Sequence, residues 1–168
     1  LTGSDGSDII VGGDGDDIII VSSAGEGNGD SIDGGAGSDT LQLSTGSHTF
    51  SNDGRIQNIQ TFTLNASGTQ VTLTGQTEGL IITGGNGNDV IVAGTGSDIV
   101  NAGSGSDTVT GASGNDTIDL GANDNQTDTI IMGLNEGLDL IEEFKAGATN
   151  GDIFKYTGKR FSKYIIYL

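Results

Sequence analysis

The chain of 168 residues has no cysteine, no proline and no tryptophan, and its 6 basic residues face 23 acidic ones. Without cysteine, neither a disulfide framework nor a thiolate metal site is available. Glycine is abundant at 31 residues, and this glycine without proline argues against collagen and against a disordered linker. No apolar run approaches the roughly 18 residues of a transmembrane helix, and no signal segment is recognisable, so we expect no membrane span.

The negative charge is unevenly distributed along the chain. Residues 1–144 contain 22 acids and a single base, Arg55, whereas residues 145–168 contain five bases and only Asp152. A surface with a net charge of −17 repels nucleic acid and anionic membranes and attracts cations. We therefore expect a cation-binding protein without a nucleic-acid partner.

A nine-residue pattern, Gly-Gly-x-Gly-x-Asp-x-U-x, in which U is a large apolar residue, recurs along the chain. Such internal repeats indicate a solenoid in which each repeat is one structural unit. Leu1 lies nine residues before the U residue Ile10, and no initiator Met precedes it, so we expect a fragment of a larger protein that begins within a repeat. The full matches are "GGDGDDIII" (12–20), "GGAGSDTLQ" (34–42) and "GGNGNDVIV" (84–92); copies with one position relaxed are 3–11, 93–101, 102–110 and 111–119, and 25–33 is a poorer copy.

Nine residues suit a six-residue turn followed by a three-residue strand, whose central residue points to one side and whose neighbours point to the other. Two repeats then form one coil of 18 residues, with strands on opposite sides and the U residues meeting between them. The spacing therefore predicts an all-β fold, a parallel β-roll of nonapeptide repeats, with coils about 4.8 Å apart.

The same spacing predicts that the coil continues through residues 43–83, where the glycine-aspartate motif is missing. Counting back in nines from Ile82 gives Leu73 and Leu64 as U residues. Each nine-residue repeat forms one rung of the coil. In these rungs the Asp position would hold the apolar residues Phe62, Val71 and Leu80.

The motif aspartates lie on the turns, and those two motifs apart should meet at the same edge of the coil. Unit charges about 4.8 Å apart repel by roughly 3.5 kcal/mol at an effective dielectric constant of about 20. We therefore expect cations between the aspartates of adjacent coils. The expected neighbours are Asp8 with Asp30, Asp17 with Asp39, Asp89 with Asp107, and Asp98 with Asp116.

The glycines of these turns permit backbone angles that direct carbonyl oxygens toward a centre. Carboxylate and carbonyl oxygens form a hard ligand set, which favours Ca²⁺ over zinc or copper and over Mg²⁺ with its stricter octahedral geometry. We therefore predict several Ca²⁺ ions shared between adjacent coils. The predicted metal-site residues are Asp8, Asp17, Asp30, Asp39, Asp89, Asp98, Asp107, Asp116 and Asp128, with Gly12, Gly13, Gly15, Gly34, Gly35, Gly37, Gly84, Gly85, Gly87, Gly94, Gly96, Gly103 and Gly105.

Residues 1–42 and 84–131 resemble the repeats of the RTX, or haemolysin-type calcium-binding, family. The resemblance implies Ca²⁺ bound in the turns between adjacent coils of a right-handed parallel β-roll. It also implies a chain that stays unfolded in the calcium-poor cytosol, leaves the cell by type I secretion and folds outside. The location implied is therefore secreted or at the bacterial cell surface.

Residues 139–154, "DLIEEFKAGATNGDIF", resemble the flank that commonly closes such rolls, so we predict a C-terminal cap. Ile141, Phe144, Ile153 and Phe154 are the candidates for covering the last rung. The tail 156–168 matches no family signal; it fits a strand of the cap, part of a secretion signal or a sequence not native to the repeats. The predicted segments are calcium-binding repeats over 1–42, a continuing coil with calcium-free rungs over 43–83, calcium-binding repeats over 84–131 and a capping segment over 132–168.

Catalytic motifs are missing from the sequence. Neither H-E-x-x-H nor G-x-S-x-G occurs, and "GKR" (158–160) lacks the spacing of a phosphate loop. We therefore predict that this chain is not an enzyme. His48, the only histidine, has no candidate partner and is expected at the surface.

Two functions fit these observations. The first is a calcium-dependent structural or assembly module of a bacterial surface protein, such as a surface-layer protein or adhesin. The second is the folding and secretion tail of an exported lipase, protease or cytolysin. Apolar residues beside U favour the first, because outward apolar stripes can pack against copies of the chain or other parts of a larger parent protein, although β-branched residues are also simply good strand formers. These residues are Ile9, Val11, Ile18, Ile20, Val90 and Val92.

Overall fold

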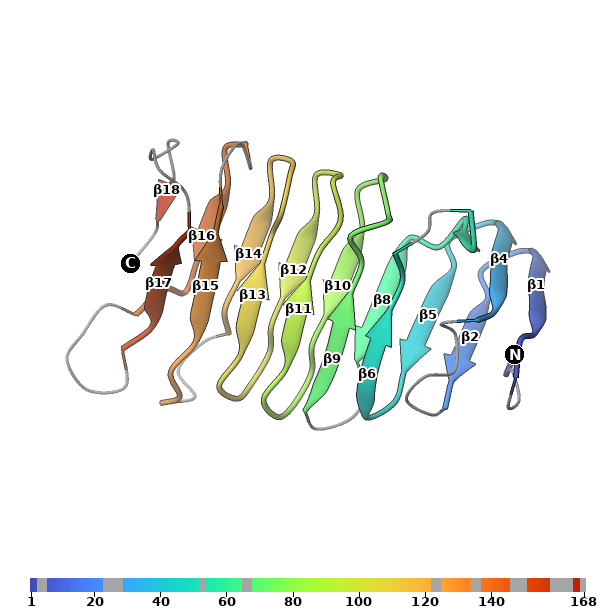
Figure 1. Ribbon diagram of the computed structural model, residues 1–168, viewed down its shortest axis with the longest axis horizontal. Helices are drawn as coiled ribbons and strands as arrows, with labels where there is room; N and C mark the ends of the chain where they lie inside the picture. Colours follow the sequence, from blue (N-terminus) through green and yellow to red (C-terminus); the bar gives the residue numbers. More distant parts are fainter. Residues whose placement is uncertain are drawn as a thin grey trace.

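The chain forms a solenoid of short parallel β-strands in the computed structural model (Figure 1). The structure describes residues 1–2, 6–22, 29–51, 54–64, 68–121, 125–133, 137–145, 151–157 and 165–166, and every regular element in these ranges is a β-strand. Across this described part, no helix has the length and apolar character needed to cross a membrane. The predicted all-β parallel roll is confirmed.

The strands form three sheets in which every pair is parallel. The eight-stranded sheet contains β2 (Ile18–Val21), β5 (Thr40–Leu43), β8 (Thr61–Leu64), β10 (Ile81–Thr83), β12 (Ile99–Asn101), β14 (Thr117–Asp119), β16 (Leu140–Glu142) and β18 (Ile165–Ile166). The six-stranded sheet contains β6 (Gly46–Thr49), β9 (Thr69–Thr72), β11 (Val90–Val92), β13 (Thr108–Thr110), β15 (Thr129–Met132) and β17 (Ile153–Tyr156). The three-stranded sheet contains β1 (Ile9–Asp14), β4 (Ser31–Ala36) and β7 (Ile56–Gln57).

The nine-residue period sets the strand register. Val100 in β12 pairs with Ile82 in β10 and with Ile118 in β14, so neighbours in one sheet are 18 residues apart in this region. Each of these U residues is buried, at 0 to 1% exposure. Two repeats therefore make one coil, with their U residues facing each other across a thin core.

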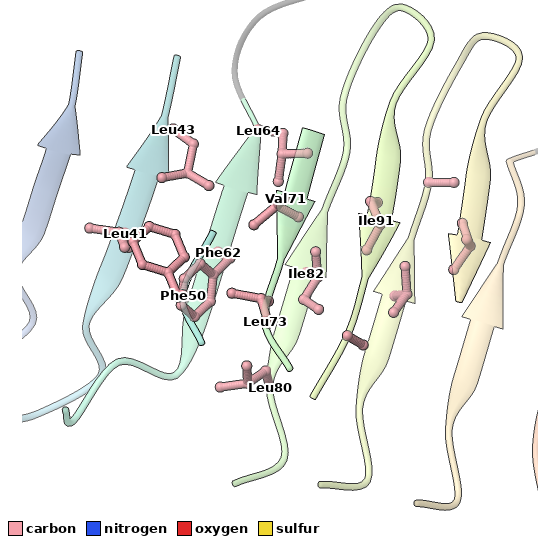
Figure 2. Close-up of a cluster of buried hydrophobic side chains, with 14 of the residues drawn as sticks. Leu41, Leu43, Phe50, Phe62, Leu64, Val71, Leu73, Leu80, Ile82 and Ile91 are labelled. Carbon is pink, nitrogen blue, oxygen red and sulfur yellow. The ribbon is translucent and has the colours of Figure 1, made fainter. Parts of the chain in front are cut away.

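A second row of buried side chains lies two residues after U. Figure 2 shows Leu43, Leu64 and Leu73 of this row beside the U residues Leu41 and Ile82. All of them are fully buried. In these coils the core is therefore two side chains deep along the strand direction, whereas the motif repeats have glycine or alanine at this second position.

The middle segment continues the coil, but the predicted register over residues 57–74 was wrong by two residues. Phe62 pairs with Leu41 and Ile82, and Val71 pairs with Ile91, so Phe62 and Val71 occupy the U positions. Two extra residues before "GQTEGLIIT" (75–83) restore the predicted register, in which Leu80 holds the Asp position. The error arose because Leu64 and Leu73 occupy the second buried row, which is also apolar here.

His48 is buried in the core, so the predicted surface position was wrong. It lies in β6 in register with Val71 and is 0% exposed. Its Nε2 lies 2.9 Å from the carbonyl oxygen of Ser44, to which it donates a hydrogen bond. The sequence concealed this because a U position usually holds an apolar residue.

The described residues of the predicted capping segment 132–168 continue the coil. Strands β16, β17 and β18 add to the eight- and six-stranded sheets in register, so the structure does not confirm a separate cap. Ile141 is a buried U residue, and Phe144 and Phe154 pack against the core. Ile153 is 43% exposed, so it does not cover the last rung as predicted.

Candidate metal sites

A row of aspartates runs along each edge of the solenoid, two residues before the U position. From the second coil on, the Oδ1 atom of an aspartate accepts a hydrogen bond from the backbone N–H of the equivalent residue one coil earlier. The N···Oδ1 distances are 2.8 Å for Asp8 to Asp30, 2.8 Å for Asp17 to Asp39, 2.8 Å for Asp89 to Asp107, 2.9 Å for Asp98 to Asp116 and 2.8 Å for Asp107 to Asp128. The four aspartate pairs expected from the sequence are therefore neighbours.

The second oxygen of several of these carboxylates has no donor. Oδ2 of Asp17, Asp39 and Asp89 is buried without a hydrogen-bond partner. Oδ2 of Asp98, in contrast, accepts the N–H of Gly94 at 3.2 Å. A buried carboxylate oxygen without a donor is costly, and a cation is the usual remedy. The carboxylates thus fit a bound metal ion.

The first position of each motif is small where an aspartate follows five residues later. A Cβ at Gly12 would lie 2.7 Å from Oδ2 of Asp17, and one at Gly111 would lie 2.5 Å from Oδ2 of Asp116. The first position therefore provides the space for the carboxylate. Where the residue five positions later is not an aspartate, the same position holds a large buried residue: Val21, Leu43, Phe50, Leu64, Leu73, Leu120 or Met132. An aspartate of the edge rows follows Val21, Leu120 and Met132 only after nine, eight and seven residues.

The second glycine of the motif keeps the turns of adjacent coils in close contact. Gly35 has a φ of +97°, and a Cβ there would collide with the carbonyl oxygen of Gly13 in the preceding coil. Only glycine adopts this angle without strain while leaving that carbonyl accessible. Eight of the predicted glycines share a positive φ: Gly13, Gly15, Gly35, Gly37, Gly85, Gly87, Gly103 and Gly105.

Backbone carbonyls would have to supply most of the ligands. In the part of the chain that the structure describes, no three side chains of His, Cys, Asp or Glu gather as a potential metal cluster. One carboxylate per turn combined with carbonyl oxygens of glycine-rich turns is a set of hard oxygen donors, which suits Ca²⁺. The assignment of individual ligands from the sequence stays a prediction.

Burial changes the protonation of these carboxyls in the metal-free chain. It raises the pKa of Asp89 from 3.8 to about 6, and the N–H of Thr69 offsets this only in part. Burial also raises the pKa of Asp98, to which the negative charge of Glu78 adds, and burial raises the pKa of Asp139. The fold thus disfavours the charged form unless a cation compensates.

The Asp positions along the two edges of the solenoid form two edge rows, and four residues of these rows were not predicted from the sequence. Asp139 and Asp152 extend the aspartate rows beyond the repeats, whereas Gln60 and Thr69 occupy the Asp position in the middle segment. The spacing of Asp139, two residues before Ile141, could have revealed it. Gln60 and Thr69 could not be identified, because the register there was wrong.

Comparison with known protein families gives an independent result. A family model described as the RTX calcium-binding nonapeptide repeat matches the chain in four copies, over residues 1–23, 22–47, 83–118 and 92–126. The matches together cover more than half of the chain and leave out residues 48–82 of the middle segment. No curated protein matches the chain.

Enlarging the first motif position should expel the carboxylate. Ala102→Leu should weaken calcium binding and destabilise the coil by about 1–3 kcal/mol, because leucine overpacks the space beside Asp107. The control is Leu73→Ala, which removes a buried side chain next to a turn whose Asp position holds Leu80, and it should leave the number of bound ions unchanged. Calcium titration calorimetry on both variants tests this; an unchanged ion count in Ala102→Leu would contradict it.

In the presence of a chelator, the stability of the chain should rise as the pH falls from about 7 to about 4. The folded state binds a proton at Asp89 near pH 6, whereas the unfolded chain does so only near 3.8, so acid favours folding across this window. Asp89→Asn should reduce the slope. Far-UV circular dichroism of the chelator-treated chain at several pH values measures the folded fraction, and a loss of β signal as the pH falls across this window would refute the burial argument.

Proposed function

Because the chain belongs to the family of RTX calcium-binding nonapeptide repeats, we propose that it folds on Ca²⁺ binding after export and serves as a structural and assembly module of a bacterial surface protein, such as a surface-layer protein or adhesin. The observation that carries the calcium dependence is the buried Oδ2 atom without a donor at Asp17, Asp39 and Asp89. Each requires a positive partner for the folded state to be stable.

The aspartates, the glycines and the U residues would contribute to calcium binding in different ways. The aspartates supply negative charge and are held by N–H groups of the preceding coil, the glycines keep carbonyls accessible, and the U residues hold adjacent turns at a fixed spacing. Bound calcium would supply the compensating charge. Extracellular calcium modules have dissociation constants of about 10⁻⁴ to 10⁻³ M, so a single site stabilises weakly and several linked sites are needed for a sharp response.

The flat faces of the solenoid support the assembly function. From β5 to β13, the outward side chains of the eight- and six-stranded sheets carry no charge, although the chain has a net charge of −17. The charges of these repeats lie on the turns, so lateral contact between faces does not bring like charges together. The outward residues include Ile81 and Ile99, which are adjacent in the sheet and 47% and 53% exposed.

Asparagine at an edge-row position should separate the hydrogen bonding of the carboxylate from its negative charge. Asp89→Asn keeps an Oδ1 acceptor for the N–H of Thr69 but removes the charge. We expect it to raise the calcium concentration needed for folding by about tenfold, or about 1.4 kcal/mol, while leaving the metal-free chain equally or more stable. The measurement is far-UV circular dichroism during Ca²⁺ titration of the chelator-treated chain, with Mg²⁺ as the ion control.

Asp14→Asn is the matched control for this experiment, because Asp14 is the exposed last residue of β1 and lies in a repeat of the same type. Its calcium midpoint should equal that of the unaltered chain. Full β structure of the unaltered chain in chelator, or equal midpoints for the two variants, would show that the aspartates act as ordinary turn residues.

Assembly should depend on the uncharged faces. In calcium, the unaltered chain should sediment as species larger than a monomer, and Ile99→Lys should reduce this association without changing the calcium midpoint. Ser113→Lys adds the same charge on an exposed turn and should have little effect. Analytical ultracentrifugation over a range of concentrations tests this. A chain that stays monomeric in calcium would favour the folding and secretion tail of an exported enzyme or toxin instead.

A further inference from the structure

The turn around Asp139 lies beyond the last family-model match, which ends at residue 126, and has no double-glycine motif. It is nevertheless placed on the preceding turn of the same edge by three hydrogen bonds. The N–H of Asp116 donates to Oδ1 of Asp139 at 2.9 Å, the N–H of Leu138 donates to Oδ1 of Asn115 at 2.8 Å, and the N–H of Leu140 donates to the carbonyl oxygen of Asp116 at 2.8 Å.

The same three bonds join turns within the calcium-binding repeats. Asp98 donates to Oδ1 of Asp116 at 2.9 Å, Ser106 donates to Oδ1 of Asn88 at 2.9 Å, and Thr117 donates to the carbonyl oxygen of Asp98 at 2.8 Å. The turn at residues 137–140 therefore has the backbone arrangement of a repeat although its sequence departs from the motif.

Gly137 provides a second point of agreement. Its φ is +103°, and a Cβ there would collide with the carbonyl oxygen of Gly114. Gly114 is related to Gly96 in the same way. The third motif glycine is thus retained at Gly137, where it allows the close approach of the two turns.

The carboxyl group of Asp139 shares its environment with those of Asp17, Asp39 and Asp89 in the repeats. The residue is 1% exposed, and its Oδ2 atom is buried without a hydrogen-bond donor. Asp152, which extends the row on the opposite edge, differs. Its Oδ1 accepts the N–H of Asp128 at 3.0 Å and its Oδ2 accepts the N–H of Lys145 at 2.6 Å, so both oxygens are satisfied by the backbone.

We propose that Asp139 and the turn of Asp116 form a further Ca²⁺ site, so that the metal array on this edge extends one coil beyond the recognisable repeats. The opposite edge ends without a metal at Asp152, where backbone N–H groups replace the ion. This inference rests on the proposed calcium-dependent folding. The C-terminal flank would then respond to calcium on the edge that carries Asp139 but not on the edge that carries Asp152.

The test is a count of bound calcium per chain, by native mass spectrometry and by equilibrium dialysis at saturating calcium. Asp139→Asn should bind one ion fewer than the unaltered chain, because asparagine keeps the bond to Asp116 but lacks the charge. Asp152→Asn should bind the same number as the unaltered chain. An equal count for Asp139→Asn and the unaltered chain, or the loss of an ion in Asp152→Asn, would overturn the assignment.

A second measurement on the unaltered chain covers the case in which Asp139→Asn does not fold. Gd³⁺ in place of calcium should broaden the amide signals of Asp116, Leu138 and Asp139 as strongly as those of Asp89 and Asp107. Broadening at Asp89 and Asp107 without broadening at Leu138 and Asp139 would overturn the Asp139 site while leaving calcium-dependent folding intact. If the unaltered chain binds no calcium at all, the proposed function itself fails.

Discussion

The stability of this solenoid depends on carboxylates that are stacked along its edges, about one strand spacing apart, and are removed from water. One oxygen of each carboxylate is satisfied by the coil before it, as between Asp89 and Asp107. At Asp17, Asp39 and Asp89 the other oxygen has no donor, and burial raises the pKa of Asp89 well above its ordinary value. The turn geometry, the small residue beside the carboxylate and the affinity for calcium all follow from this arrangement of buried charge.

In the middle of the chain, uncharged residues replace the aspartates of the edge rows. Its Asp positions hold Gln60, Thr69 and Leu80, and the space left beside them is filled by large apolar residues of the second buried row. Phe50 and Phe62 also contact each other here, with ring centroids 5.9 Å apart. The coil is therefore held by apolar packing in the middle and by carboxylates that need a cation toward both ends, within one continuous set of parallel sheets.

The repeats made most of the fold and the candidate site predictable. A period of nine residues with a fixed apolar position dictates the strand, the turn and the coil, and it brings Asp98 beside Asp116 before any coordinates are known. Prediction failed where the motif lost its glycines. Over residues 57–74 two apolar rows alternate, and periodicity alone cannot distinguish the U residue Phe62 from Leu64. His48 was misplaced because it is a polar residue at a U position, and only its strand partners show that it points inward.

The sequence by itself determined the period, the pairing of the aspartates and the class of ion, because these depend on local spacing and on the chemistry of oxygen ligands. Only the tertiary structure decided which carboxylate oxygens lack a donor, since that depends on the backbone N–H groups that another coil brings to them. Asp139 and Asp152 are both single aspartates near an apolar residue in the sequence. One is left with a buried, unsatisfied oxygen and the other is closed by Asp128 and Lys145, a difference that arises only when the coils stack.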